Sequence, residues 1–248
     1  MEFLLALQFL TRIPVPLRCA VTERQLARSM AYYPLVGLLL GGAAVLLHLL
    51  VARFAAAPVA DLAAVTLLVL LTGNMHLDGL MDTADGIWSG RPREQMLEIM
   101  RDSRVGSHAV AAGILVLLAK IILLGQISPA ARTAALLLFP VLGRWSIVYA
   151  ATIHPYARSH GLGRFTASLG KWQLLFASAV TLALSYYLLQ TAGLILCGAV
   201  LLGAVLLAAY LARRVGGMTG DLLGAVNELM EVLALIVLLL LQKNFGTQ

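Results

Sequence analysis

The chain has 248 residues, of which 60% are hydrophobic and only 12% are charged, and its mean hydropathy is +0.90. An ordinary soluble domain has about 25% charged residues, so this composition argues against a water-soluble protein and indicates residence in a membrane. The two cysteines, Cys19 and Cys197, exclude a disulfide framework or a zinc site. The net charge of +6 comes from basic residues that flank apolar segments, which indicates membrane topology and no binding of nucleic acid.

The chain begins with the apolar segment MEFLLALQFLTRIPVP, which lacks both a basic region and a cleavage site of small residues. It therefore does not read as a signal peptide, and we expect a short interfacial helix that ends at Pro14 and Pro16. A membrane span takes roughly 20 apolar residues. Candidate spans follow at residues 31–51, 62–77, 109–127, 133–152, 173–189, 192–211 and 226–241.

The linkers between these spans are short, and no soluble segment separates them. We therefore expect one all-α domain over residues 1–248, a polytopic membrane helix bundle of about seven transmembrane helices. The second span is the least regular, because its far end enters a polar motif. The number falls to six if residues 62–86 are re-entrant.

The basic residues gather at alternate linkers. If the N-terminus is cytoplasmic, only Arg53, Arg132 and Lys243 fall on the outer side, which satisfies the positive-inside rule. Asp61 is then the only acidic residue outside. We expect a multi-pass protein of the bacterial cytoplasmic (inner) membrane, with its N-terminus and its active site facing the cytoplasm.

Three aspartates stand at the polar end of the second span, in GNMHLDGLMDTADGIWSG. Asp78, Asp82 and Asp85 are spaced by four and three residues, so a helix places them on one face, and Asn74 extends the same stripe. Stacked carboxylates repel one another, more strongly beside a low-dielectric membrane, and a divalent cation relieves this. Oxygen ligands favour a hard cation such as Mg²⁺. The alternative is a solvated helix end.

The following segment, RPREQMLEIMRDSRVGSH, places one carboxylate between two guanidiniums. Asp102 lies between Arg101 and Arg104, just before the third span. This arrangement suits a site that binds both metal and phosphate. The alternative is a salt bridge at the lipid headgroups.

A second acidic cluster begins the last span, in RRVGGMTGDLLGAVNELMEVL. Asp221 and Glu228 are seven residues apart and share a helix face, and Asn227 is adjacent. Glycines recur every four residues over 216–224, which permits close helix approach. We expect this helix to pack against the first cluster and complete the site. The alternative is that Asp221 only stabilises a helix N-terminus.

Some polar or small residues within the spans have more ordinary explanations. The spacing of Gly37 and Gly41 predicts a helix-packing seam. A charge within a span is costly, so Arg144 is expected to face the site or a carboxylate. His48 is expected to make a packed polar contact, and His76 is expected to face away from the aspartate stripe.

The run HLDGLMDTADGIWSGRPREQMLEIMRDSRVGSHAV resembles the signature of the cobalamin synthase family, also called the adenosylcobinamide-GDP ribazoletransferases. Five other stretches are similar to the family too, so the resemblance covers almost the whole chain: QFLTRIPVP, YYPLVGLLLGG, KI at 120–121, YARSHGLGRF and GGMTGDLLGAVNELMEV. The resemblance implies a transfer of the adenosylcobinamide-phosphate moiety from adenosylcobinamide-GDP to α-ribazole or its 5′-phosphate. The products are adenosylcobalamin or its 5′-phosphate, and GMP. It also implies Mg²⁺ as cofactor.

In such a reaction a ribose hydroxyl attacks a diphosphate. We then expect magnesium ligands among Asp78, Asp82, Asp85 and Asp102. We expect catalytic roles for Asp82, Asp102 and Glu228. Contacts with substrate or phosphate are expected from Arg101, Arg104, Arg158, Lys171, Asp221 and Asn227. Related phosphotransferases suggest a homodimer by analogy, and the family suggests association with other late enzymes of the corrinoid pathway.

Two other classes of membrane protein share part of this pattern. The segment Asp82-x-x-Asp85-Gly86 is similar to the D-x-x-D-G opening of the CDP-alcohol phosphotransferases. The Ala-Arg expected after that opening is missing, however, and Gly106 stands near the place of the fourth aspartate. A cation transporter would place its acidic residues near the middle of the membrane, whereas here they gather at one face.

Overall fold

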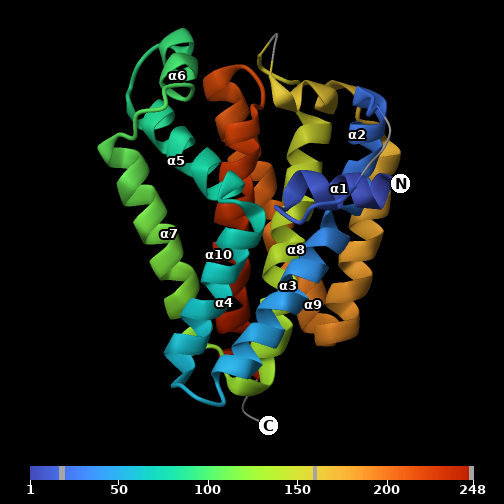
Figure 1. Ribbon diagram of the computed structural model, residues 1–248, viewed down its shortest axis with the longest axis vertical. Coiled ribbons are helices and arrows are strands. Elements are labelled where there is room, and N and C mark those ends of the chain that lie inside the picture. The colour runs from blue at the N-terminus through green and yellow to red at the C-terminus, as the bar shows by residue number, and fades with distance from the viewer. Residues whose placement is uncertain (17–19, 159–160, 246–248) are drawn as a thin grey trace.

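The structure is a computed structural model that describes residues 1–16, 20–158 and 161–245 (Figure 1). Within these ranges the chain is helical and forms no β-strand, as predicted. The α-helices are α1 (Glu2–Leu10), α2 (Glu23–Ser29), α3 (Tyr33–Val51), α4 (Ala57–Thr72), α5 (Met75–Trp88), α6 (Arg93–Ile99), α7 (Ser107–Gln126), α8 (Pro129–Ile153), α9 (Lys171–Val215) and α10 (Gly220–Phe245). Two 3₁₀ helices are η1 (Met30–Tyr32) and η2 (Leu162–Ser168).

Several of these helices are long and apolar enough to cross a membrane. In the described part of the chain, five segments meet this condition, and the bent pair of α4 and α5 brings the number to as many as six. The protein is therefore a multi-pass helical membrane protein. The predicted number of about seven spans is not confirmed.

Helix α9 carries two of the predicted spans. A straight helix of its 45 residues would be about 67 Å long, more than twice the roughly 30 Å hydrocarbon core. It is instead broken at Gln190, where φ is 52° and ψ is −132°. A Cβ atom on Gly193 would lie 2.0 Å from the carbonyl oxygen of Ser185, so the chain turns back on itself here (Figure 1). The predicted segments 173–189 and 192–211 lie on either side of this break.

The predicted span 62–77 is interrupted. Helix α4 ends at Thr72, and Gly73 and Asn74 both adopt left-handed backbone conformations, with φ of 62° and 66°. Helix α5 then starts at Met75, at 87° to α4. Asn74 thus precedes the helix and does not extend the aspartate stripe, because a left-handed residue breaks the helical register.

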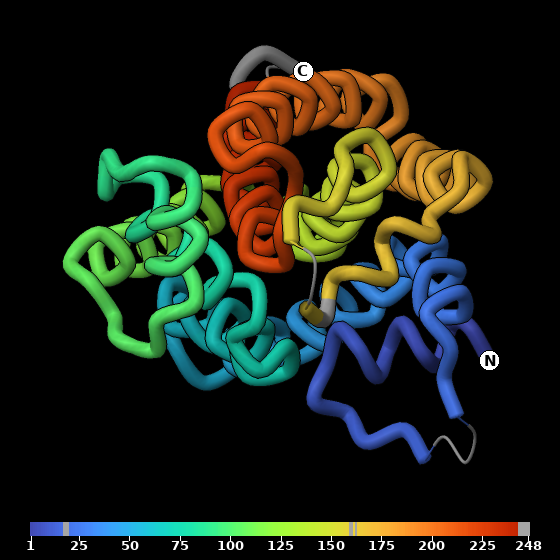
Figure 2. Tube along the Cα trace, turned by 90° about the horizontal axis from the view of Figure 1, so that it is seen from above, coloured from blue at the N-terminus to red at the C-terminus, as the bar shows by residue number. Residues whose placement is uncertain are grey.

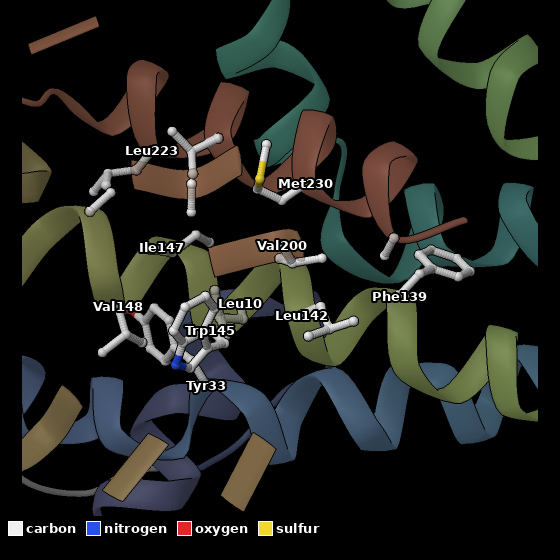
Figure 3. Packing of buried hydrophobic residues seen from close by; sticks show 14 of the residues in the cluster. Leu10, Tyr33, Phe139, Leu142, Trp145, Ile147, Val148, Val200, Leu223 and Met230 are labelled. Carbon is white, nitrogen blue, oxygen red and sulfur yellow. The ribbon is translucent and has the colours of Figure 1, made fainter. Parts of the chain in front are cut away.

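Helix α8 lies at the centre of the bundle, between α3 and α10. Figure 3 shows Leu223 and Met230 of α10 on one side of α8 and Tyr33 of α3 on the other. The predicted seam of Gly37 and Gly41 is confirmed as the contact of α3 with α8. A Cβ on either glycine would lie 2.6 Å from a carbonyl oxygen of α8, so only glycine allows the two backbones to approach this closely.

A buried polar cluster joins α3, α4 and α8 at the end opposite the aspartates. His48 Nε2 lies 3.1 Å from Asp61 Oδ1, and Arg132 Nη1 lies 3.7 Å from Asp61 Oδ2. The Asp61 side chain is fully buried, and Arg132 also donates to the carbonyl oxygen of Ile127 at 2.9 Å. The prediction that His48 makes a packed polar contact is confirmed.

The N-terminal segment forms α1, the short helix expected there. It lies across the direction of the long helices, as Figures 1 and 2 show. The backbone N–H of Arg12 donates to the carbonyl oxygen of Leu71 at 2.7 Å, which ties the end of this segment to the end of α4. Helix α1 is thereby positioned to contribute Phe9 and Leu10 to the cavity described below.

Candidate active site

Close packing of α5 against α10 brings the two acidic clusters together. A Cβ on Gly79 would lie 2.9 Å from the carbonyl oxygen of Asp221, and a Cβ on Gly224 would lie 2.9 Å from that of His76. The absence of side chains at both glycines therefore sets the distance between the helices. The expectation that the start of the last helix packs against the first cluster is confirmed.

Two loops position a guanidinium at this junction. The backbone N–H of Ala157 donates to the carbonyl oxygen of Met218, and that of Met218 donates to Pro155, both at 2.8 Å. This pairing places Arg158 next to α10, where its Nη2 lies 2.8 Å from Asp221 Oδ2. The Arg158 side chain is only 10% exposed, and within the described ranges its Nε has no hydrogen-bond partner.

A cavity of about 290 Å³ opens beside this ion pair. The polar residues at one end of it include His76, Asp78, Tyr156, Arg158 and Asp221. The rest of its wall is largely apolar and comes from α1, η1, α3, α8, η2 and α10. The structure thus places three of the predicted site residues, Asp78, Arg158 and Asp221, around one cavity.

Asp78 and Asp82 are the free carboxylates of the stripe. They lie one turn apart on α5, Asp78 exposed and Asp82 half-buried. Within the described part of the chain, neither side chain makes a hydrogen bond or an ion pair. The negative charges of Asp78 and Asp221 both repel that of Asp82. The negative charge at this edge of the cavity therefore favours the binding of a cation.

Asp85, the third aspartate, is not free but accepts hydrogen bonds from the backbone. Its Oδ2 accepts a hydrogen bond from the backbone N–H of Gly106 at 2.7 Å, and its Oδ1 accepts one from Ala109 at 2.9 Å. These amides belong to the N-terminus of α7, where backbone donors lack partners within the helix. Asp85 thus caps α7.

Asp102 forms a closed pair with Arg104 on the surface. Arg104 Nε donates to Asp102 Oδ1 at 3.0 Å, and its Nη2 donates to Oδ2 at 2.5 Å. These hydrogen bonds lower the pKa of Asp102 to about 2. Arg101 and Lys171 are exposed, and neither lines the cavity, so the structure does not bring these four residues to Asp78.

Glu228 and Asn227 lie deeper in the bundle, in a buried ionic network. Lys120 Nζ lies 2.6 Å from Glu228 Oε2 and 2.5 Å from Glu231 Oε2, while Arg144 pairs with Glu231. The Asn227 amide donates to both glutamates, at 3.2 and 3.1 Å. The prediction that Arg144 faces a carboxylate is confirmed. This network surrounds a second, much smaller cavity and does not line the one beside Asp78.

The predicted magnesium ligands were Asp78, Asp82, Asp85 and Asp102. Among the described residues, no three His, Cys, Asp or Glu side chains are grouped so that they could hold a metal ion. Mg²⁺ in proteins, however, is usually held by one or two carboxylates together with water and substrate phosphates. Asp78 and Asp82 are two unpaired oxygen donors beside a cavity, so their chemistry fits such a site.

Sequence reasoning missed His76 and Tyr156 at the polar end of the cavity. His76 and Asp78 are two residues apart within α5, so helical periodicity places their side chains on different faces of the helix, as expected. The His76 side chain is buried, and among the described residues its Nδ1 has no hydrogen-bond partner. The signal for each residue was its place in a stretch that resembles the family, His76 in HLDG and Tyr156 in YARSHGLGRF.

The fold and this site define the chain as a multi-pass helical membrane protein with a cavity lined by carboxylates and a buried guanidinium. Comparison with known proteins gives the family. The family model described as cobalamin-5-phosphate synthase matches residues 2–239, and the chain belongs to this family.

Similar proteins match the chain over almost its whole length. Three are named adenosylcobinamide-GDP ribazoletransferase, and they come from Thermoanaerobacter pseudethanolicus, Desulforamulus reducens and Klebsiella pneumoniae strain 342. They are 39%, 41% and 44% identical to the chain, and each alignment covers 95–96% of it and 95–99% of the relative. No solved structure matches it. The resemblance inferred from the motifs is confirmed.

Proposed function

We propose that this protein is an adenosylcobinamide-GDP ribazoletransferase, which joins the adenosylcobinamide-phosphate moiety to α-ribazole or its 5′-phosphate and releases GMP. The observation that carries this proposal is the near full-length similarity to relatives of that name. The cavity between α5 and α10 supports it, because a free carboxylate and a buried guanidinium line one wall.

The reaction is a displacement at phosphorus. The ribose 3′-hydroxyl of the acceptor attacks the phosphorus that carries cobinamide, the bond from this phosphorus to the oxygen of GMP breaks, and GMP departs with the electron pair. Catalysis of such transfers depends on positioning and on stabilising charge. Arg158 is suited to hold a phosphate, because its guanidinium is planar, already desolvated and only partly used by Asp221.

We further propose that Asp78 and Asp82 hold Mg²⁺ together with the diphosphate of the donor. A bound Mg²⁺ neutralises charge on the diphosphate and on the leaving group. In its absence, the carboxylates of the stripe would repel the anionic substrate. Metal binding would therefore give the two unpaired carboxylates a function, whereas carboxylates at a solvated helix end would have none.

The hydroxyl proton needs an acceptor. Of the three residues predicted to be catalytic, Glu228 is already paired with Lys120, and Asp102, with a pKa of about 2, is a poor base. Asp82 is unpaired and stands one turn from the cavity, which favours it. Even as a metal ligand, a carboxylate keeps a second oxygen that can accept a proton.

We propose that the cavity faces the cytoplasm of a bacterium, across its inner membrane. Both substrates are large and polar. The basic residues of the chain also lie mostly at the end of the bundle that carries the aspartates, as the positive-inside rule requires of a cytoplasmic side.

The test uses protein purified in detergent and supplied with adenosylcobinamide-GDP, α-ribazole 5′-phosphate and Mg²⁺. GMP and the corrinoid product are followed by chromatography, with and without a chelator. Magnesium-dependent product formation supports the proposal. Turnover of a CDP-alcohol in place of the corrinoid would move the protein to the CDP-alcohol phosphotransferases. Full activity of Asp82→Ala would refute the proposed mechanism.

A further inference from the structure

The apolar end of the cavity is built from aromatic rings of three elements that the proposed chemistry does not use. Phe9 of α1, Tyr33 of α3 and Phe165 of η2 all line it. The rings of Phe9 and Phe165 meet edge to face, with centroids 5.4 Å apart and planes at 84°. The rings of Phe9 and Tyr33 are stacked, at 6.3 Å and 17°. We call these three residues the aromatic wall.

The aromatic wall contains an unsatisfied hydrogen-bonding group. Tyr33 is only 1% exposed, and its hydroxyl has no hydrogen-bond partner among the residues that the structure describes. Leaving a buried hydroxyl without a partner costs free energy, and buried tyrosines usually find one. A ligand in the cavity that offers a hydrogen-bond acceptor among apolar atoms would satisfy it. The wall therefore has the character of a binding surface for a flat, largely apolar group with one polar atom.

The size of the cavity decides which part of the substrates can enter. A volume of about 290 Å³ is at the lower end of the range for small-ligand pockets. The corrin macrocycle with its adenosyl group is too large for this space. The guanine of the donor is small enough, but it carries several donors and acceptors, and the aromatic wall offers only one hydroxyl. The base of α-ribazole, a dimethylbenzimidazole, is a flat apolar bicycle with one free ring nitrogen that accepts a hydrogen bond.

We propose that the aromatic wall is the subsite for the base of the acceptor, with the Tyr33 hydroxyl donating a hydrogen bond to its free ring nitrogen. This inference rests on the proposed function. The ribose then extends toward the polar end of the same cavity, where Asp78 and Arg158 stand and where the donor's diphosphate is expected. Base recognition and phosphoryl transfer thus share one cavity, and the corrin remains outside it.

The subsite gives the enzyme a preference among acceptors. A purine base brings polar groups that the aromatic wall leaves without partners, and burying a polar group without a hydrogen bond costs free energy. An acceptor with a benzimidazole base is therefore used in preference to the same nucleotide with an adenine base. Tyr33 and Phe165 are the residues that determine this preference.

The experiment measures the KM for each substrate separately in Tyr33→Phe and Phe165→Leu. Tyr33→Phe keeps the ring and removes one hydrogen bond, so the acceptor KM should rise about 5- to 10-fold. Phe165→Leu removes a stacking surface, for which we expect about tenfold. The KM for adenosylcobinamide-GDP should change less than about twofold in both. The matched control is Phe3→Leu, because Phe3 also lies on α1 but packs against Tyr32 and does not line the cavity.

The outcomes separate this inference from the proposed function. If the wild-type enzyme forms no corrinoid product, the proposed function fails. If it is active but both variants keep the acceptor KM, or raise the KM for adenosylcobinamide-GDP instead, the subsite assignment is wrong. Free dimethylbenzimidazole provides a measurement that needs no variant. Inhibition of the wild-type enzyme that is competitive with the acceptor supports the subsite, and competition with adenosylcobinamide-GDP overturns it.

Discussion

The carboxylate of Asp85 accepts two backbone hydrogen bonds at the start of α7, from Gly106 at 2.7 Å and from Ala109 at 2.9 Å. A Cβ on Gly106 would lie 2.6 Å from both carboxylate oxygens, so glycine is needed for this contact. The negative charge also complements the positive end of the helix dipole. One member of the aspartate stripe is therefore used to fix α7 against α5, whereas its role as a metal ligand stays a prediction.

Replacing Asp85 distinguishes these roles. Asp85→Ala should lower the free energy of unfolding by about 1–2 kcal/mol, the usual effect of losing a helix cap, and thermal denaturation in detergent measures it. Asp85→Asn keeps one acceptor and should recover part of this loss. Glu98→Ala, an exposed carboxylate on α6, is the control. If Asp85→Asn retains stability but loses all transfer activity, Asp85 acts on the substrate or metal and not only as a cap.

The ionic network in the bundle should be sensitive to loss of its shared cation. Lys120→Met removes the partner that Glu228 and Glu231 have in common and leaves buried negative charge with Arg144 alone. Breaking a buried pair in this way costs about 3–5 kcal/mol. We expect a large drop in the thermal midpoint, partly recovered in the double variant Lys120→Met/Glu228→Gln. A midpoint unchanged in Lys120→Met would mean that the network does not stabilise the fold.

Activity of Glu228→Gln tests the predicted catalytic role of Glu228. A general base contributes about 10²–10⁴-fold to the rate. Because Glu228 is held by Lys120 away from the cavity, we expect kcat to fall by less than about tenfold, with the KM for either substrate unchanged. A fall in kcat of three orders of magnitude in a stably folded variant would show that Glu228 acts in catalysis.

Sequence patterns predicted the local features of this fold well. The four- and three-residue spacing of the aspartates does place them on one helix, and the glycine pair of α3 does pack on α8. Because a charge within a span is costly, Arg144 was expected to face the site or a carboxylate, and it pairs with the carboxylate of Glu231. The identity of that carboxylate could not be predicted, since Glu231 is 87 residues away and helix packing alone decides which charges meet.

The site itself depends on contacts that no local pattern encodes. Arg158 reaches Asp221 because two loops that are far apart in the chain pair through Ala157 and Met218. The bend at Gly73 and Asn74 divides the predicted span 62–77, because both residues adopt left-handed backbone conformations that the apolar run does not reveal. Asp102 follows the stripe in the chain, but its carboxylate pairs with the nearby guanidinium of Arg104 and does not reach the cavity.

The contact of α5 with α10 should tolerate no side chain at Gly79. In Gly79→Ala the new methyl group would lie 2.9 Å from the carbonyl oxygen and 3.0 Å from the Cα atom of Asp221, so the backbones must separate. Overpacking of this kind costs about 1–3 kcal/mol, and it would also move Asp221 away from Arg158. We expect lower thermal stability and lower activity together. The control is Gly42→Ala on α3, where no atom lies within 4 Å of the added Cβ.

The free carboxylates of the stripe should show opposite effects on activity and stability. Asp78 and Asp82 repel each other one turn apart, and Asp221 adds to the repulsion. Removing one charge in Asp82→Asn or Asp78→Asn should therefore raise the thermal midpoint of the metal-free protein, as often occurs when functional residues are replaced. Transfer activity should fall at least about 10²-fold, because a donor to the metal or an acceptor of the proton is lost.

Both quantities can be measured on the same detergent preparations, with Glu98→Gln as the control for loss of an exposed carboxylate. Adding Mg²⁺ should stabilise the wild-type protein, since a ligand that binds only the folded state shifts the unfolding equilibrium. The same addition should stabilise Asp82→Asn less. If the variants are less stable than the wild-type protein without Mg²⁺, the carboxylates of the stripe have partners within the fold. If the variants keep full activity, other residues bind the metal and accept the proton.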